Sequence, residues 1–153
     1  MSDSLQVYAE YASAFEETFG DDDWSRLEKY FSEDARYEVS GSPFACKIYG
    51  RNAVFAGLKK SIDGFDRKFS NRELELTAGP TLTATEDGGE IRITWNVHYQ
   101  MDGALDISLS GGSFFLVRDG VIQLMRDEYR DEELGEVGAW LAQHGVGLNG
   151  AYV

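Results

Sequence analysis

Residues 91–101 alternate strictly between apolar and polar side chains, and this stretch constrains the fold more than any other feature of the sequence. Its apolar members are Ile91, Ile93, Trp95, Val97, Tyr99 and Met101. Alternating side chains point to opposite faces of a sheet, so the stretch predicts a long strand with one buried face. Turn-forming Asp-Gly pairs stand at 87–88, 102–103 and 119–120. The second half of the chain therefore predicts an antiparallel meander of long strands.

The first half of the chain has helical periodicity instead. Apolar residues recur at three- and four-residue spacing over 5–19, 24–31 and 55–69, which predicts three helices. The acidic run 21–23 is expected to be a solvated cap between the first two. Alternation over 35–39 predicts a strand, and a short last helix is expected over 134–141. The predicted fold is α+β: a curved antiparallel sheet forming a cone, three helices of the N-terminal half packed on its concave face, and a short C-terminal helix.

Length and charge limit the classes of function. The 153 residues carry 27 acidic and 14 basic side chains, a net charge of −13. Phosphate backbones and anionic lipids bind basic surfaces, so we expect no nucleic-acid partner and no membrane partner. One domain is expected over 1–144, followed by a flexible glycine-rich tail over 145–153. The sequence has no recognisable signal peptide and no apolar membrane span, which favours a cytoplasmic protein.

No residue pattern points to a metal or a cofactor. The single cysteine, Cys46, can form neither an intrachain disulfide nor a thiolate cluster, and the two histidines are isolated in the sequence. The glycines of 145–150 match a dinucleotide-binding pattern, but they follow a predicted helix where that motif needs a strand. We therefore expect neither a metal nor a cofactor.

The hairpins predict which side chains share a face of the sheet. With a three-residue turn at 102–104 and a two-residue turn at 119–120, one face is almost wholly apolar. The other face mixes polar and apolar side chains, among them Thr94, Asn96, His98, Phe114, Met125, Asp127 and Tyr129. A sheet with apolar groups on both faces has to be covered twice. Helices can cover one face, and we predict that a second copy of the chain covers the other in a homodimer.

Three stretches of sequence resemble one known superfamily. They are WSRLEKYFSEDARYEV at 24–39, YGRNAVFAGLKKSI at 49–62 and VRDGVIQLMRDEY at 117–129. Together with the opening helix they resemble the nuclear transport factor 2-like superfamily, and within it the SnoaL-like branch, over roughly residues 5–131. The resemblance implies a cone-shaped sheet that encloses a pocket and often pairs with a second copy.

The resemblance can be tested against specific activities. Similarity to ketosteroid isomerase would require proton-transferring side chains at positions that fall on Phe15, Val39 and Gly112, none of which can do this. Similarity to limonene epoxide hydrolase matches an Asp to Asp127. The partner Arg and Asp of that family would fall near Thr94 and Asn96, which cannot hold a second carboxylate ionised. Epoxide hydrolysis is therefore not expected.

Asp127 and His98 are the predicted catalytic residues. In SnoaL-like polyketide cyclases a single Asp acid/base carries the chemistry, and the resemblance gives this role to Asp127. An apolar pocket would raise its pKa toward the working range, whereas the alternative is a carboxylate hydrogen-bonded for structure at the pocket mouth. His98 titrates near neutrality, but an ideal sheet separates it from Asp127 by roughly 16 Å. It then either contacts a ligand separately or satisfies a polar neighbour.

Eight further residues are expected to contact a ligand. They are Thr94, Asn96, Phe15, Phe19, Trp24, Phe114, Met125 and Tyr129. The aromatic ones can line a cavity for a flat apolar molecule, although aromatics at helical spacing also form plain core. The expected function is acid/base chemistry on a small apolar ligand, of the isomerase, cyclase or dehydratase type. The alternative is a non-catalytic ligand-binding protein or an interaction module of the same fold.

Overall fold

A computed structural model describes residues 2–40, 45–69, 71–100, 106–130, 139–140 and 152. Its helical elements are α1 (Ser2–Asp21), the 3₁₀ helix η1 (Trp24–Tyr30), α2 (Arg51–Gly64) and the 3₁₀ helix η2 (Asp66–Lys68). Its strands are β1 (Phe31–Ser40), β2 (Cys46–Tyr49), β3 (Asn71–Thr85), β4 (Gly88–Gln100), β5 (Ile107–Arg118) and β6 (Val121–Tyr129). No helix in these described ranges is long and apolar enough to cross a membrane.

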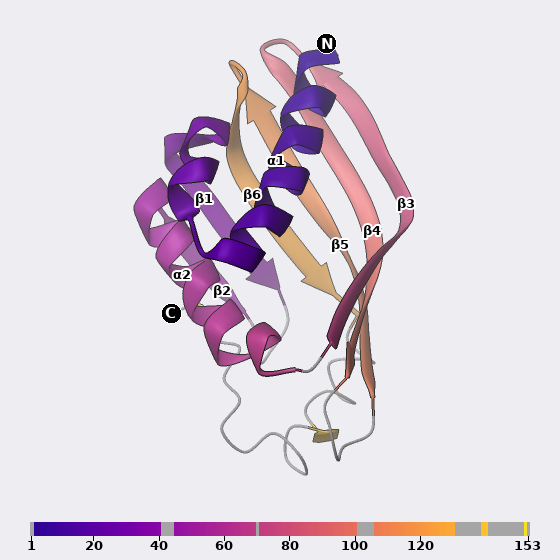
Figure 1. The fold of residues 1–153 in the computed structure, drawn as a ribbon. Coiled ribbons are helices and arrows are strands. Elements are labelled where there is room, and N and C mark those ends of the chain that lie inside the picture. Colours follow the sequence, from indigo (N-terminus) through magenta and orange to yellow (C-terminus); the bar gives the residue numbers. More distant parts are fainter. Residues whose placement is uncertain are drawn as a thin grey trace.

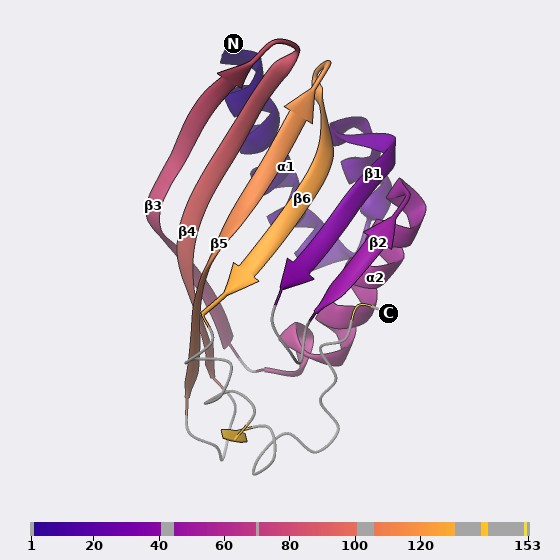
Figure 2. The same ribbon diagram turned by 180° about the vertical axis from the view of Figure 1, so that it is seen from behind.

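The strands form one curved sheet in the order β2-β1-β6-β5-β4-β3 (Figures 1 and 2). All neighbours are antiparallel except β1 and β6, which run parallel. Helix α1 packs against β3 to β6 and α2 against β1 and β2, on the same face of the sheet (Figure 1). The predicted α+β fold with three helices on the concave face is confirmed. The predicted last helix lies outside the described residues except for 139–140, and the limits of the domain and tail stay predictions.

The buried side of α1 differs from the predicted stripe. Tyr8, Tyr11, Ala14 and Thr18 are buried. The apolar spacing over 5–19 predicts that Leu5, Tyr8, Ala12, Phe15 and Phe19 form the buried side of this helix. Tyr8 is the one of these five that is buried, and the other four are half-buried. Two of the half-buried residues, Ala12 and Phe15, line a cavity between α1 and the sheet.

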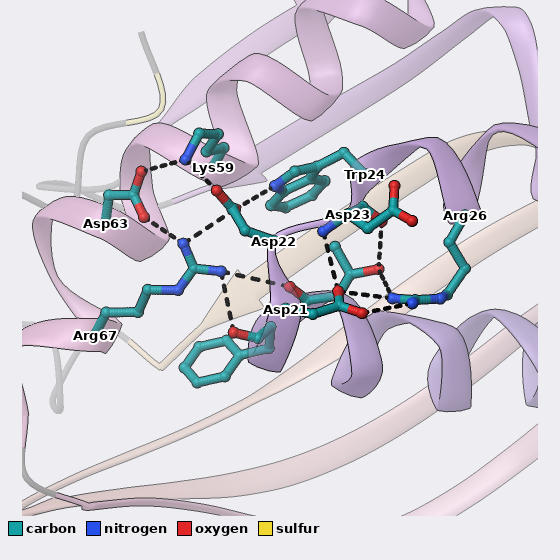
Figure 3. Close-up of polar contacts among 10 residues, drawn as sticks. Asp21, Asp22, Asp23, Trp24, Arg26, Lys59, Asp63 and Arg67 are labelled. Carbon is teal, nitrogen blue, oxygen red and sulfur yellow. Dashed lines mark hydrogen bonds and ion pairs between the residues drawn. The ribbon is translucent and has the colours of Figure 1, made fainter.

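The acidic run Asp21–Asp23 joins α1 to α2 through ion pairs (Figure 3). Lys59 of α2 contacts Asp22 Oδ2 at 2.7 Å and Asp63 Oδ2 at 2.8 Å, and Arg67 pairs with the same two acids. Hydrogen bonding by Lys59 first, then by Trp24, lowers the pKa of Asp22 to about 2. The run is exposed as expected, but Asp23 at the N-cap of η1 makes no side-chain capping hydrogen bond. Asp22 instead connects the end of α1 to α2.

A bulge in β6 changes the predicted assignment of faces. Arg118 pairs with Val121, as the two-residue turn predicts, and Val117 pairs with Ile122. The next pair is Leu116 with Leu124, so Gln123 is an extra residue without an opposite partner on β5. One extra residue reverses the alternation along the rest of a strand. The prediction that Met125, Asp127 and Tyr129 share a face with Thr94, Asn96 and His98 is therefore wrong.

The outer face of the sheet is largely polar in the described residues. Thr94 and Asn96 are exposed there, and His98 hydrogen-bonds with Ser108 Oγ at 2.6 Å and lies 3.3 Å from Asp106 Oδ2. The ring of Phe114 lies between two guanidinium groups, of Arg92 at 4.7 Å and Arg126 at 5.3 Å. The homodimer stays a prediction.

Candidate functional site

The concave face of the sheet and the helices enclose a cavity of about 190 Å³. Its walls are mostly apolar, and many of the side chains are aromatic, namely Tyr8, Tyr11, Phe15, Tyr37, Trp95, Tyr99, Phe115, Tyr129 and Tyr152. Leu74 and Leu76 of β3 also line it and are 47% and 45% exposed, so the cavity opens between α1 and β3. Such a space suits an apolar molecule with one or two rings, because engineered cavities of about 150 Å³ bind benzene.

Asp127 of β6 projects into this cavity, and both of its carboxylate oxygens accept hydrogen bonds. The Tyr37 hydroxyl donates to Oδ2 at 2.5 Å, and the Ser113 hydroxyl donates to Oδ1 at 2.5 Å. Trp95 Nε1 in turn donates to Ser113 Oγ at 2.9 Å. Since Ser113 lies directly opposite Asp127 in the β5–β6 register, the sheet itself sets this geometry.

Two more tyrosines extend the hydrogen bonds from Asp127. The Tyr152 hydroxyl hydrogen-bonds with both Tyr37 and Tyr129. The ring of Tyr152 packs edge-on against that of Tyr37, with 5.2 Å between centroids. A chain of hydroxyl groups therefore leads from Tyr129 through Tyr152 and Tyr37 to the carboxylate.

The electrostatics of the cavity raise the pKa of Asp127 above its ordinary value. Burial raises the pKa of Asp127, while the hydrogen bonds from Ser113 and Tyr37 lower it by less. No Lys, Arg or His contacts this carboxyl among the described residues. Burial, and secondly the Asp127 charge, raises the pKa of Tyr37 well above its ordinary value. The surrounding tyrosines hence stay protonated at neutral pH and act as donors.

A second polar cluster lies on the wall of the same cavity. Asp66 Oδ2 accepts from Arg72 Nε at 3.0 Å and from the Tyr99 hydroxyl at 3.1 Å. The side chains of Asp66 and Arg72 are only 16% and 15% exposed. Burial raises the pKa of Asp66 in spite of the opposing charge of Arg72. We call these three residues the Arg72 cluster.

Four of the ten predicted site residues line the cavity, namely Asp127, Phe15, Met125 and Tyr129. Six do not: Thr94, Asn96, His98 and Phe114 lie on the outer face, and Phe19 and Trp24 lie beside the cavity. Phe19 packs under the guanidinium groups of Arg67 and Arg72, and Trp24 packs against Phe15 and Phe55. The structure therefore does not bring His98 and Asp127 together.

Several cavity residues escaped the sequence prediction, notably Tyr37, Ser113, Tyr152 and the Arg72 cluster. Tyr37 had a usable signal, because it is the central apolar residue of the alternating stretch 35–39. Ser113 had none, since its position opposite Asp127 depends on the bulge. In the described part of the chain no group of three or more His, Cys, Asp or Glu residues could hold a metal ion.

Comparison with solved structures shows the same fold. Bal32a, from a soil-derived mobile gene cassette, has a TM-score of 0.64 at 18% identity, over 90% of this chain and 98% of that one. An LEH-like epoxide hydrolase of M. tuberculosis has a TM-score of 0.61 at 18% identity, over 95% of this chain and 97% of that one. A candidate polyketide cyclase of Xanthomonas campestris pv. campestris has 0.56 at 23% identity, over 92% and 98%.

A search of curated protein sequences finds no match to the chain. The family model of the SnoaL-like domain matches residues 12–125, which include the second half of α1, α2, β1 to β5 and the start of β6. The chain therefore belongs to the family of SnoaL-like domains.

Proposed function

We propose that this protein is an acid/base enzyme that moves a proton on a small, mainly apolar molecule, with Asp127 as the group that takes and returns it. The observation that carries the proposal is a carboxyl in a mainly apolar cavity, held on both oxygens by neutral hydroxyl groups and without a cationic partner among the described residues. A carboxylate deprived of water and of a cation is a stronger base than one in solution. Perturbed groups of this kind cluster at functional sites.

The proposed reaction is a simple proton cycle. The Asp127 carboxylate takes a proton from a carbon or hydroxyl of the bound molecule, and the resulting carboxylic acid returns a proton to another atom of it. The Tyr37 and Ser113 hydroxyls donate to the carboxylate before transfer and hold its orientation during the cycle. Isomerisation and cyclisation need only this exchange, and dehydration also releases water from the same molecule.

A second candidate function is ligand binding without chemistry. It is favoured by one observation, that both Asp127 oxygens already accept hydrogen bonds and can serve to fix the aromatic wall. In that case Asp127 would orient Tyr37 and Ser113, and the cavity would only hold the molecule. An interaction module of the same fold would use a surface and not the cavity.

Mass spectrometry of co-purifying small molecules distinguishes the two candidates. The wild type and Asp127→Asn are incubated with the same cell extract, repurified and analysed for bound molecules. An enzyme predicts substrate on the variant and product on the wild type, differing by nothing in mass (isomerisation or cyclisation) or by one water (dehydration). The same molecule in the same form on both proteins would contradict catalysis and leave ligand binding.

A further inference from the structure

We infer that Arg72 binds an uncharged oxygen of the ligand, such as a ketone, ester or phenol oxygen, so that the cavity recognises apolar molecules that carry one. This inference deepens the proposed function and rests on it for the reaction at Asp127, which lies at a different part of the same cavity wall. Arg72 pairs with Tyr99 of β4. Asp127 pairs with Ser113 of β5, which in turn pairs with Ile93 of β4.

Arg72 lines the cavity, and its guanidinium has more hydrogen-bond donors than its described partners use. Of its five N–H groups, the one on Nε donates to Asp66. The terminal nitrogens make no hydrogen bond to any residue that the structure describes, and the nearest carboxylate to them, of Glu16, is 3.7 Å from Nη1. The ring of Phe19 lies 4.9 Å from the guanidinium and covers one of its faces. The group is therefore held in place with donors to spare.

Stability alone gives little reason for a charged pair in this position. Taking an Arg and an Asp out of water costs about as much as their attraction returns, so buried pairs contribute little net stability. Arg72 is moreover the one Lys or Arg among the described residues that line the cavity. A fixed, partly desolvated donor on a mainly apolar wall is the kind of group that orients a ligand.

The charges around Arg72 favour a neutral oxygen over an anion. Asp66 already balances the guanidinium, and Glu16 adds a further negative charge on the same side. A carboxylate ligand would be repelled by both acids, in a protein with a net charge of −13. A carbonyl or phenol oxygen still gains a charge-assisted hydrogen bond from the terminal nitrogens.

Three bicyclic probes of matched shape test this inference by calorimetry: 1-indanone with a ketone oxygen, indane with none, and indane-1-carboxylate with a negative charge. We expect the wild type to bind indanone at least about tenfold more tightly than indane, and the carboxylate more weakly than indanone. Arg72→Met should reduce the preference for indanone over indane to about threefold or less.

Two additional variants keep the test decisive. Arg72→Met leaves Asp66 buried without its partner, so the double variant Asp66→Asn/Arg72→Met removes both charges together and should lose the preference in the same way. Arg67→Met is the matched control. Its guanidinium also packs on Phe19, at 5.4 Å, but pairs with Asp22 and Asp63 outside the cavity wall, and it should retain the preference.

Four results would overturn the inference: a preference that survives in both Arg72 variants, a preference lost in Asp127→Asn, tighter binding of the carboxylate than of indanone, or no binding of any probe. Failure of the proposed function looks different. If Asp127→Asn leaves the co-purified molecules unchanged while the preference still depends on Arg72, the oxygen site stands and the acid/base role of Asp127 falls.

Discussion

The Tyr37 hydroxyl donates a 2.5 Å hydrogen bond to Asp127 Oδ2 across 90 positions of sequence. The two residues come from β1 and β6, the single parallel pair among the described strands. In that register Tyr37 is opposite Met125 and Val39 is opposite Asp127, so the phenol reaches diagonally to the carboxylate. The contact joins the first strand in the sequence to the last described one, and the two are neighbours in the sheet. The chemistry of the cavity depends on their pairing.

Replacement of Asp127 by Asn should reduce turnover by about 10²- to 10⁴-fold, the usual contribution of a positioned acid/base. Affinity for the ligand should change much less, because the aromatic wall is intact. Asp106→Asn is the matched control, since Asp106 is exposed on the outer face beside His98. Equal loss of turnover in both variants would show that the effect is not specific to the cavity.

The same Asp127→Asn variant should be more heat-stable than the wild type at pH 8. Burial raises the pKa of Asp127 above the ordinary 3.8, so the native state binds more protons than the unfolded chain at intermediate pH. Wild-type stability from this group therefore falls as the pH rises through the raised pKa. The advantage of Asn should shrink as the pH falls through the raised pKa, because protonation of Asp127 removes the buried charge, and melting temperatures across that range measure it.

Asp22→Asn should give the opposite pH dependence and serves as the comparison. Hydrogen bonds from Lys59 and Trp24 lower the pKa of Asp22 to about 2. Its contribution is present above 3.8 and is lost as the pH falls through about 2, so the variant should be less stable than the wild type at neutral pH. The effect should be small and weaken with added salt, because the ion pairs are exposed. Parallel pH profiles for the two Asn variants would refute both assignments.

Removal of either donor should raise the pKa of Asp127 further. Tyr37→Phe and Ser113→Ala each delete one hydrogen bond that favours the ionised form. The acid limb of the pH–rate profile should move to higher pH in each, and further in the double variant. Tyr49→Phe controls for loss of a phenol, as Tyr49 is 66% exposed. An unshifted acid limb would mean that another group sets it.

Gly57→Ala should destabilise the protein, although Ala is the better helix former by about 1 kcal/mol. A Cβ on Gly57 would lie 2.8 Å from the Tyr152 carbonyl oxygen and 2.6 Å from Ile48 Cδ1. The Ile48 side chain can rotate, but the Tyr152 backbone has to move. Gly20→Ala in α1 has nothing within 4 Å and should be neutral or stabilising by up to about 1 kcal/mol.

A shortened chain ending at residue 151 tests the cause of that destabilisation. Without Tyr152, Gly57→Ala should no longer lower the melting temperature, because the carbonyl oxygen is gone. A loss of the same size in the shortened chain would assign the clash to Ile48 alone.

The sequence was sufficient to predict the sheet and its turns because alternation and Asp-Gly pairs are local signals. It also selected Asp127, through a resemblance near the end of the chain. It assigned the wrong neighbours to Asp127 because nothing in the residues around Gln123 marks a bulge. The sequence could not predict the Arg72 cluster, because only tertiary packing brings η2, β3 and β4 together.

Gln123 has no role in the proposed chemistry, but it determines which of the β6 side chains after it face the cavity. Deleting that one codon would leave every cavity-lining residue in the protein and would restore simple pairing with β5. Asp127 would then be carried to the solvent side of the sheet, and Arg126 to the interior. In this fold, the position of a functional group depends on the number of residues that precede it in its strand as much as on the identity of the group.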